Sequence, residues 1–453
     1  MTTSVGTPAS VGDTEHEPLP PILRRLFASL EAARVPYVLL RGYLPVTELR
    51  ESLDIDVFIP ELALPAAAPV LESNGWRRRA AQTGRYPHVF FDNWESSSGM
   101  VRSIDVVTSL CFGTEVRRLL RDHTVLEGSE TEHGIRVPAP WLAACCFALH
   151  VLLDKRGLSN ANQQRGLALR ERCRADAAGS MTLAEQLGSD TARLTEDFLQ
   201  FLDENSQSEL TRLIQHAERL PALAPQRLLA RWHTLRTRWR QFVRPVARIA
   251  IFGIDGSGKS TLVQMATDQS GTLSIHNGYL GNNAYRTPPA KWLSKRIVQE
   301  QAKSAPSSLL LRVLINIDTF WRPFELAARM LIAEHRAELV MYDRFPIGQD
   351  DGTPTTVWGR VVLAYTRAGR ALLPAPDLVI LLDGDDHTIW SRKQEMPFEV
   401  HVRTQAKYRK LVSELHMEHA IVRTDGTLNE SFSGLRTAIA SCRAVQAKLY
   451  SSA

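Results

Sequence analysis

Three short apolar runs in the second half of the chain each end in polar or charged residues. They cover residues 248–252, 338–342 and 377–382, and segments with helical periodicity separate them. Continuous apolar runs of this length are typical of strands that are buried on both faces. Strands that alternate with helices predict a parallel sheet with crossover helices. Ligands of such sheets bind beyond the carboxyl ends of the strands.

The first half of the chain has a different pattern. From about Pro21 to Leu220 a helix is followed by short strands and then by long helical segments rich in Leu and Arg. We therefore expect one α+β domain with a helical tail over residues 22–224. Residues 1–21 are polar and acidic, and they lack the basic and apolar regions of a signal peptide. We expect this segment to be a disordered lead.

Residues 225–245 predict an amphipathic helix between the two halves. The apolar residues recur at spacings of four and three, which places them on one stripe of a helix, and arginines occupy the other faces. They are Leu228, Trp232, Leu235, Trp239 and Phe242. One interpretation is a linker helix that packs on a domain. The other is peripheral contact with an anionic membrane surface.

The composition is that of a soluble globular protein. The chain has 453 residues, 44% hydrophobic and 23% charged, which favours two or three domains. A net charge of +5 and a pI near 9.0 suit phosphorylated ligands, but they are too weak to indicate a nucleic-acid partner. Five cysteines without a CxxC spacing favour a cytoplasmic location and no structural zinc. The oligomeric state stays open, with a dimer as one option.

Residues 253–260 read GIDGSGKS and match the phosphate-binding pattern GxxxxGK[ST]. The loop follows an apolar strand and leads into a helix, so several backbone N–H groups and the helix dipole converge on one point. We expect Lys259 to contact the β- and γ-phosphates of ATP and the Ser260 hydroxyl to ligate Mg²⁺. The full set of expected nucleotide-binding residues is Gly253, Gly256, Ser257, Gly258, Lys259, Ser260 and Thr261.

Charged residues follow the other two predicted strands. Asp343 and Arg344 come after the second strand, where a carboxylate can hold Mg²⁺ or accept a proton and a guanidinium can clamp a phosphoryl group. The segment SRKQE at 391–395 follows the third strand and brings Arg392 to a position suited to a basic lid. The order of these features indicates phosphoryl transfer.

Residues 246 to about 441 resemble the thymidylate kinase family of P-loop nucleoside monophosphate kinases. The matching segments are GIDGSGKST, the dipeptide at 343–344, PDLVILLD at 376–383, the basic segment at 391–395, Tyr408 and IVRTDG at 421–426. The resemblance implies a P-loop kinase domain over 246–445. It also implies that Asp255, Arg344 and Arg392 surround the phosphoryl donor and acceptor.

One segment departs from that family's pattern. Residues 274–289 read SIHNGYLGNNAYRTPP where the family carries a REPG-like stretch. The polar residues in and after this segment suit an acceptor rich in hydroxyl groups or with a different base. They are His276, Tyr279, Asn282, Asn283 and Arg286, with Arg322 as a further candidate.

The first half carries a second candidate site. Asp54 and Asp56 alternate with apolar residues, which puts both carboxylates on one face of a strand, and Asp105 lies in another apolar strand. Three converging carboxylates suit a two-metal site. This pattern resembles the minimal nucleotidyltransferase fold, although Tyr43 stands where that fold has Gly or Ser.

The sequence therefore predicts an ATP- and Mg²⁺-dependent kinase that acts on a small acceptor. A nucleoside monophosphate is favoured, and a sugar or sugar phosphate is the second option. Two alternatives remain. In the first, the main chemistry is nucleotidyl transfer through Asp54, Asp56 and Asp105. In the second, the chain is a nucleotide-gated scaffold at a membrane surface.

Overall fold

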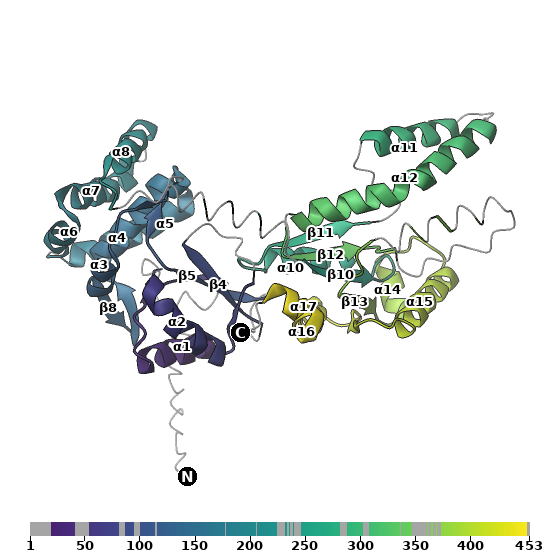
Figure 1. Cartoon of the computed structure of the whole chain (residues 1–453), viewed down its shortest axis with the longest axis horizontal. Coiled ribbons are helices and arrows are strands. Elements are labelled where there is room, and N and C mark those ends of the chain that lie inside the picture. Colours follow the sequence, from purple (N-terminus) through teal and green to yellow (C-terminus); the bar gives the residue numbers. More distant parts are fainter. Residues whose placement is uncertain are drawn as a thin grey trace, which may run out of the picture. The chain divides into compact units, whose positions relative to one another are not determined.

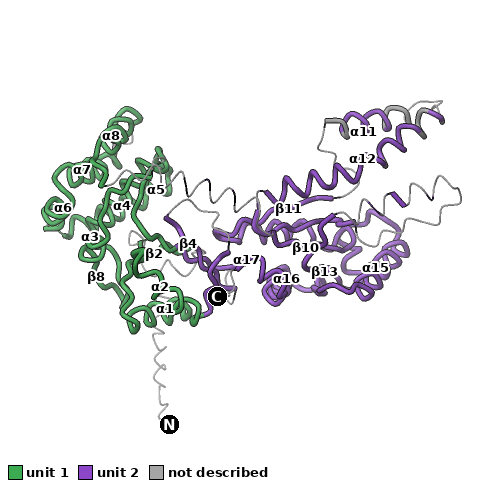
Figure 2. The backbone as a smooth tube through the Cα atoms, viewed as in Figure 1, with its two compact units in different colours: residues 1–74, 106–227 green, residues 75–105, 228–453 purple. Residues whose placement is uncertain are grey.

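A computed structural model divides the chain into two compact units (Figure 2). Unit 1 comprises residues 1–74 and 106–227, and unit 2 comprises residues 75–105 and 228–453. The structure describes residues 20–40, 54–80, 87–94, 100–113, 116–176, 178–204, 206–223, 246–280, 288–301, 308–335, 337–346 and 373–450, with single positions at 232, 235, 239, 360, 364, 365 and 368. The expected lead at 1–21 lies outside these residues except for its last two positions.

Unit 1 combines short strands with a larger number of helices (Figure 1). Its strands are short, and β1 (Val38–Leu39) pairs antiparallel with β2 (Asp54–Phe58). Its other elements are α1 (Pro21–Ala32), η2 (Glu61–Ala63), α2 (Leu64–Ser73), β6 (Cys111–Phe112), β7 (Arg117–Arg118), α3 (Asp122–Glu127), β8 (Ser129–Glu132), β9 (Ile135–Pro138), α4 (Pro140–Leu149), the π-helix η3 (His150–Lys155), α5 (Asn160–Ala175), α6 (Gly179–Leu187), α7 (Ser189–Glu204) and α8 (Gln207–Arg219).

The core of unit 1 lies mainly among its helices. α4 is apolar on nearly all sides and is buried along its length, as expected for a helix that other helices surround. Phe147 of α4 meets Phe198 of α7 edge to face, with ring centroids 6.0 Å apart. α8 presents its apolar stripe to the same cluster. Burial of these apolar side chains is the main source of stability for such a bundle.

Unit 2 is built on a five-stranded parallel sheet in the order β11-β12-β10-β13-β14. The strands are β10 (Ala247–Phe252), β11 (Ile275–Tyr279), β12 (Leu339–Asp343), β13 (Leu378–Asp383) and β14 (His419–Arg423). The helices are α10 (Lys259–Asp268), α11 (Pro288–Gln301), α12 (Ser308–His335), α14 (Asp386–Arg392), α15 (Phe398–Ser413), α16 (Leu428–Ser441) and α17 (Arg443–Leu449). The predicted parallel sheet and its three central strands are confirmed.

Helices cover both faces of this sheet, so unit 2 has three layers (Figure 1). Alternate residues of β10 belong to two separate cores. Ile249 and Ile251 pack with α10, α16 and α17, whereas Ala250 and Phe252 pack with α12 and α15. A central strand buried on both faces must be apolar throughout, which is why the predicted strands read as continuous apolar runs.

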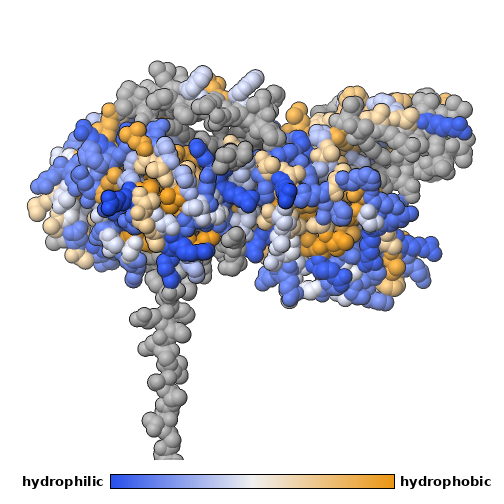
Figure 3. Space-filling view, turned by 60° about the horizontal axis from the view of Figure 1, so that its bottom comes forward, coloured by the Kyte–Doolittle hydropathy of each residue, from blue (hydrophilic) through white to orange (hydrophobic). Residues whose placement is uncertain are grey.

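Hydrophobic groups are interspersed with hydrophilic ones on the face shown in Figure 3. Within the expected helix at 225–245, the structure describes only Trp232, Leu235 and Trp239, which are helical and have exposed side chains. No helix in the described part of the chain has both the length and the apolar character needed to cross a bilayer.

Residues 75–105 belong to unit 2, although the sequence pattern placed them in the first domain. This segment contains β3 (Arg77–Arg78), which pairs antiparallel with β4 (His88–Asn93), and the first part of β5 (Arg102–Val107). Its backbone is bonded to distant parts of unit 2, since the amide of Ala80 donates to Leu449 and that of Met100 to Gln269. Tyr450 is also in the core, beyond the expected domain end at 445.

A buried ionic network fixes this segment. Arg79 is 2% exposed, and its guanidinium donates to Asp92 at 2.9 Å and to Glu338 at 3.3 Å. It also donates to the Thr272 carbonyl at 3.0 Å, while the Tyr450 hydroxyl donates to Asp92 at 3.1 Å. Desolvation lowers the pKa of Arg79, but the charges of Asp92 and Glu338 outweigh it and leave that pKa raised. The ion pair therefore stays charged although it is buried.

Arg79→Leu should lower the free energy of unfolding by about 3–5 kcal/mol, because it leaves buried carboxylates without their cation. Urea denaturation checks this. Lys410→Gln is the control, since it removes a cation from an exposed pair with Glu414, and such pairs contribute little. Equal stability of the two variants would show that the buried network is not a major support.

Candidate functional site

The phosphate-binding loop connects β10 to α10 at the carboxyl edge of the parallel sheet. Three glycines in it have positive φ, 156° at Gly253, 92° at Gly256 and 86° at Gly258, a conformation that disfavours residues with a side chain. A Cβ on Gly256 would also lie 2.9 Å from the carbonyl oxygen of Ile389 in α14. The loop therefore needs glycine at position 256 for conformation and for space.

The first helical residue after the loop is Lys259, as the motif predicts. Its Nζ is buried within the loop and donates to the carbonyls of Gly253 and Ile254, both at 2.8 Å. Burial lowers the pKa of Lys259, and the carboxylates of Asp343 and Asp255 counteract part of that effect. Ser260 and Thr261 follow in the first turn of α10 with exposed side chains.

The structure brings Asp255, Asp343 and Arg344 together around this loop. Arg344 Nη2 donates to Asp255 Oδ1 at 3.0 Å, and Lys259 Nζ lies 3.7 Å from the same carboxylate oxygen. Desolvation raises the pKa of Asp255, but the charges of Lys259 and Arg344 outweigh it, so the pKa is lowered. Asp255 is therefore held as a carboxylate that accepts hydrogen bonds.

Asp343 differs from Asp255 in its electrostatics. Burial raises its pKa, and the charges of Lys259 and Arg344 offset only part of this. Its Oδ1 is buried and has no hydrogen-bond partner among the described residues. A buried carboxylate oxygen without a partner is a suitable ligand for a hydrated divalent cation. The residues present therefore fit Mg²⁺, which Ser260 and Asp343 would hold.

These groups line a pocket of about 580 Å³ within unit 2. Arg392 and Lys393 reach it from the end of α14, in keeping with the expected basic lid. A further wall comes from the segment after β14. Thr424 and Gly426 belong to the IVRTDG match, whereas Leu428 and Ser431 were not predicted. The lining residues are Asp255, Gly256, Ser257, Gly258, Lys259, Ser260, Thr261, Leu262, Tyr279, Asp343, Arg344, Arg392, Lys393, Thr424, Gly426, Leu428 and Ser431.

Of the residues expected to bind the acceptor, only some line the pocket, and others lie outside the described residues. Tyr279 lines the pocket, and the Arg344 guanidinium lies 6.0 Å from the centroid of its ring. His276 is in β11, and Arg322 in α12 donates to Asp318 at 2.7 Å; neither is among the lining residues. Asn282, Asn283 and Arg286 lie outside the described residues.

The carboxylates of the second candidate site lie in two strands. Asp54 and Asp56 are half-buried on β2 of unit 1, while Ile55 is buried, so the predicted alternation is confirmed. Asp105 belongs to unit 2, where its carboxylate lies 2.8 Å from Nδ1 of His88. In the described part of the chain, no three His, Cys, Asp or Glu side chains form a group that could hold a metal ion. The metal-binding role of these aspartates stays a prediction, and Tyr43 lies outside the described residues.

Comparisons with known proteins give no family match. Neither a family model nor a curated protein matches the chain. The structure is similar to a deoxyadenosine kinase from M. mycoides with bound dATP, at 15% identity over 43% of this chain and 100% of that chain, with a TM-score of 0.29. It is also similar to a thymidylate kinase from Candida albicans, at 17% identity over 44% of this chain and 93% of that chain, with a TM-score of 0.31.

Gly256→Ala should destabilise the protein more than Gly258→Ala. Both changes put a side chain at positive φ, which costs about 1–2 kcal/mol. Only the Cβ at 256 would meet Ile389; at 258 no described heavy atom lies within 4 Å. Urea denaturation without nucleotide measures both losses. If the two are equal, contact with α14 does not constrain the loop.

Proposed function

We propose that unit 2 binds a nucleoside triphosphate, favouring ATP, and transfers its γ-phosphoryl group to a small acceptor. The observation that carries this proposal is the pocket itself. It combines a glycine-lined phosphate loop with a buried lysine, two carboxylates and three further cationic side chains, Arg344, Arg392 and Lys393. Phosphoryl transfer depends mainly on positioning and on neutralising charge, and these residue types do both.

Each side chain has a role in this mechanism. The loop amides and Lys259 hold the β- and γ-phosphates, and Lys259 exchanges its carbonyl partners for phosphate oxygens. Ser260 and Asp343 would hold Mg²⁺, which would neutralise phosphate charge. Arg344 and Arg392 stabilise the charge on the equatorial oxygens of the transferred group. Asp255, kept ionised by its neighbours, accepts a hydrogen bond from the acceptor and orients it.

The acceptor that we favour is a nucleoside monophosphate, on the strength of the sequence resemblance. The wall at Tyr279 and Arg344 supports an acceptor with a planar ring and an anionic group, because both an aromatic face and a guanidinium are available there. A sugar or sugar phosphate is the second option. Incubation with γ-labelled ATP and a panel of nucleosides, nucleoside monophosphates and sugar phosphates identifies the compound that gains label.

Lys259→Ala should abolish phosphoryl transfer and leave the fold intact, because it removes the cation nearest the phosphates from a pocket that the backbone still forms. The measurement is label transfer from ATP, with circular dichroism and the melting temperature as controls for folding. Wild-type rates in this variant would refute the assignment of the pocket.

We propose nucleotidyl transfer as a second candidate function, on the basis of the shared face of Asp54 and Asp56 on β2. In that case Asp54→Ala and Asp56→Ala should eliminate pyrophosphate release but spare ADP formation, because neither residue lines the phosphate-loop pocket. A pyrophosphate assay beside an ADP assay distinguishes them. Unchanged pyrophosphate yields would argue against this function.

A further inference from the structure

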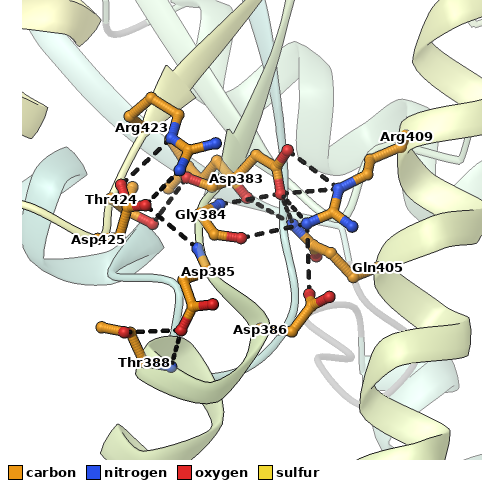
Figure 4. A network of polar contacts seen from close by, with 11 residues as sticks. Asp383, Gly384, Asp385, Asp386, Thr388, Gln405, Arg409, Arg423, Thr424 and Asp425 are labelled. Atoms are coloured by element: carbon orange, nitrogen blue, oxygen red, sulfur yellow. Dashed lines mark hydrogen bonds and ion pairs between the residues drawn. The ribbon is translucent and has the colours of Figure 1, made fainter.

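The carboxylate of Asp383, at the end of β13, is the centre of a polar network next to the pocket (Figure 4). Arg409 of α15 donates to it through Nε at 3.0 Å and through Nη2 at 2.8 Å. Gln405 donates to it at 2.6 Å and the amide of Gly384 at 2.9 Å. Desolvation raises the pKa of Asp383, but the hydrogen bonds from Arg409 and Gln405 outweigh it and the pKa is lowered. The carboxylate is therefore ionised.

The network extends from Asp383 to the pocket wall that follows β14. The Asp383 carbonyl accepts from the amide of Thr424 at 2.8 Å, and the amide of Asp385 donates to the Asp425 carboxylate at 3.3 Å. There is little space between these segments, since a Cβ on Gly384 would lie 3.1 Å from the amide nitrogen of Asp425. The ends of β13 and β14 are thus held together.

The same network fixes both ends of α14. At its start, the Asp385 carboxylate caps the helix by accepting from the amide of Thr388 at 2.8 Å, and Arg409 reaches Asp386 at 3.3 Å. At its end, Arg392 Nη1 donates to the Thr424 carbonyl at 2.6 Å. Between them, the Ile389 carbonyl faces the phosphate loop at Gly256. The position of Arg392 in the pocket therefore depends on where α14 is held.

We propose that Asp383 and Arg409 form a positioning pair for the basic lid. Neither residue is among those that line the pocket, so the pair acts through α14 and the Thr424 segment on Arg392. An ionised pair with several donors is directional, and it constrains α14 more tightly than apolar packing would. This inference rests on the proposed function, because it assigns Arg392 to the γ-phosphate of the bound nucleotide.

The test compares Arg409→Gln with Lys410→Gln in the full-length protein. Lys410 is the next residue of α15, and its exposed side chain pairs with Glu414, so the control removes the same charge without touching the network. Calorimetry measures the Kd of Mg·ATP and of Mg·ADP. Arg409→Gln should raise the Kd of Mg·ATP about tenfold, as expected for one misplaced charge-assisted contact, and change that of Mg·ADP less than about twofold.

A double variant separates positioning from general destabilisation. If Arg409 acts through Arg392, then Arg392→Gln combined with Arg409→Gln should bind Mg·ATP no more weakly than Arg392→Gln alone. Arg409→Lys keeps the charge but loses the bidentate geometry. It should give an intermediate Kd, and it replaces Arg409→Gln in the cycle if that variant does not fold.

Two results would refute the proposal that Asp383 and Arg409 position Arg392. They are equal Kd values for Arg409→Gln and Lys410→Gln, and additive losses in the double variant. Failure of the wild-type protein to bind Mg·ATP would instead overturn the proposed function, so the two failures are distinguishable.

Discussion

The connection from β10 to α10 is the constraint on which the rest of unit 2 depends. The chain must leave a strand buried on both faces and enter a helix within a few residues, while its amides stay directed at one point. Gly256 and Gly258 make this turn through positive φ, and the close approach of α14 leaves no room for a side chain at 256. The neighbouring strands β12 and β13 end at the same edge of the sheet, where their last residues, Asp343 and Asp383, lie.

Two charged groups at this edge of the sheet are in an unfavourable electrostatic environment when the pocket holds no ligand. Burial raises the pKa of Asp343 and lowers that of Lys259, so desolvation disfavours the charged form of both groups. An anionic phosphate chain and a divalent cation would each supply an opposite charge to one of them. The proposed nucleotide and its metal would therefore each offset the desolvation of one of these groups.

The sequence predicted the centre of unit 2 better than its periphery, for physical reasons. β10, β12 and β13 are apolar throughout because both faces are covered, whereas β11 and β14 are edge strands with partly exposed polar residues, and they were missed. The phosphate loop is a local motif and was found from residue spacing. The contact of Asp383 with Arg409 joins residues 26 positions apart, and that of Arg79 with Glu338 joins residues 259 apart. No local pattern reveals such pairs.

The buried network at Arg79 also bears on how the chain folds during synthesis. The segment that contains Arg79 and Asp92 leaves the ribosome early, but Asp92 bonds Tyr450, 358 positions later. Contacts of such long sequence separation form slowly because the loop between them must first close. Until the chain has been synthesised as far as Tyr450, strands β3 and β4 carry polar groups that lack some of their later partners, Glu338 and Tyr450. Completion of unit 2 must therefore wait until Tyr450 has been synthesised, whereas most of unit 1 consists of local helical contacts that can form earlier.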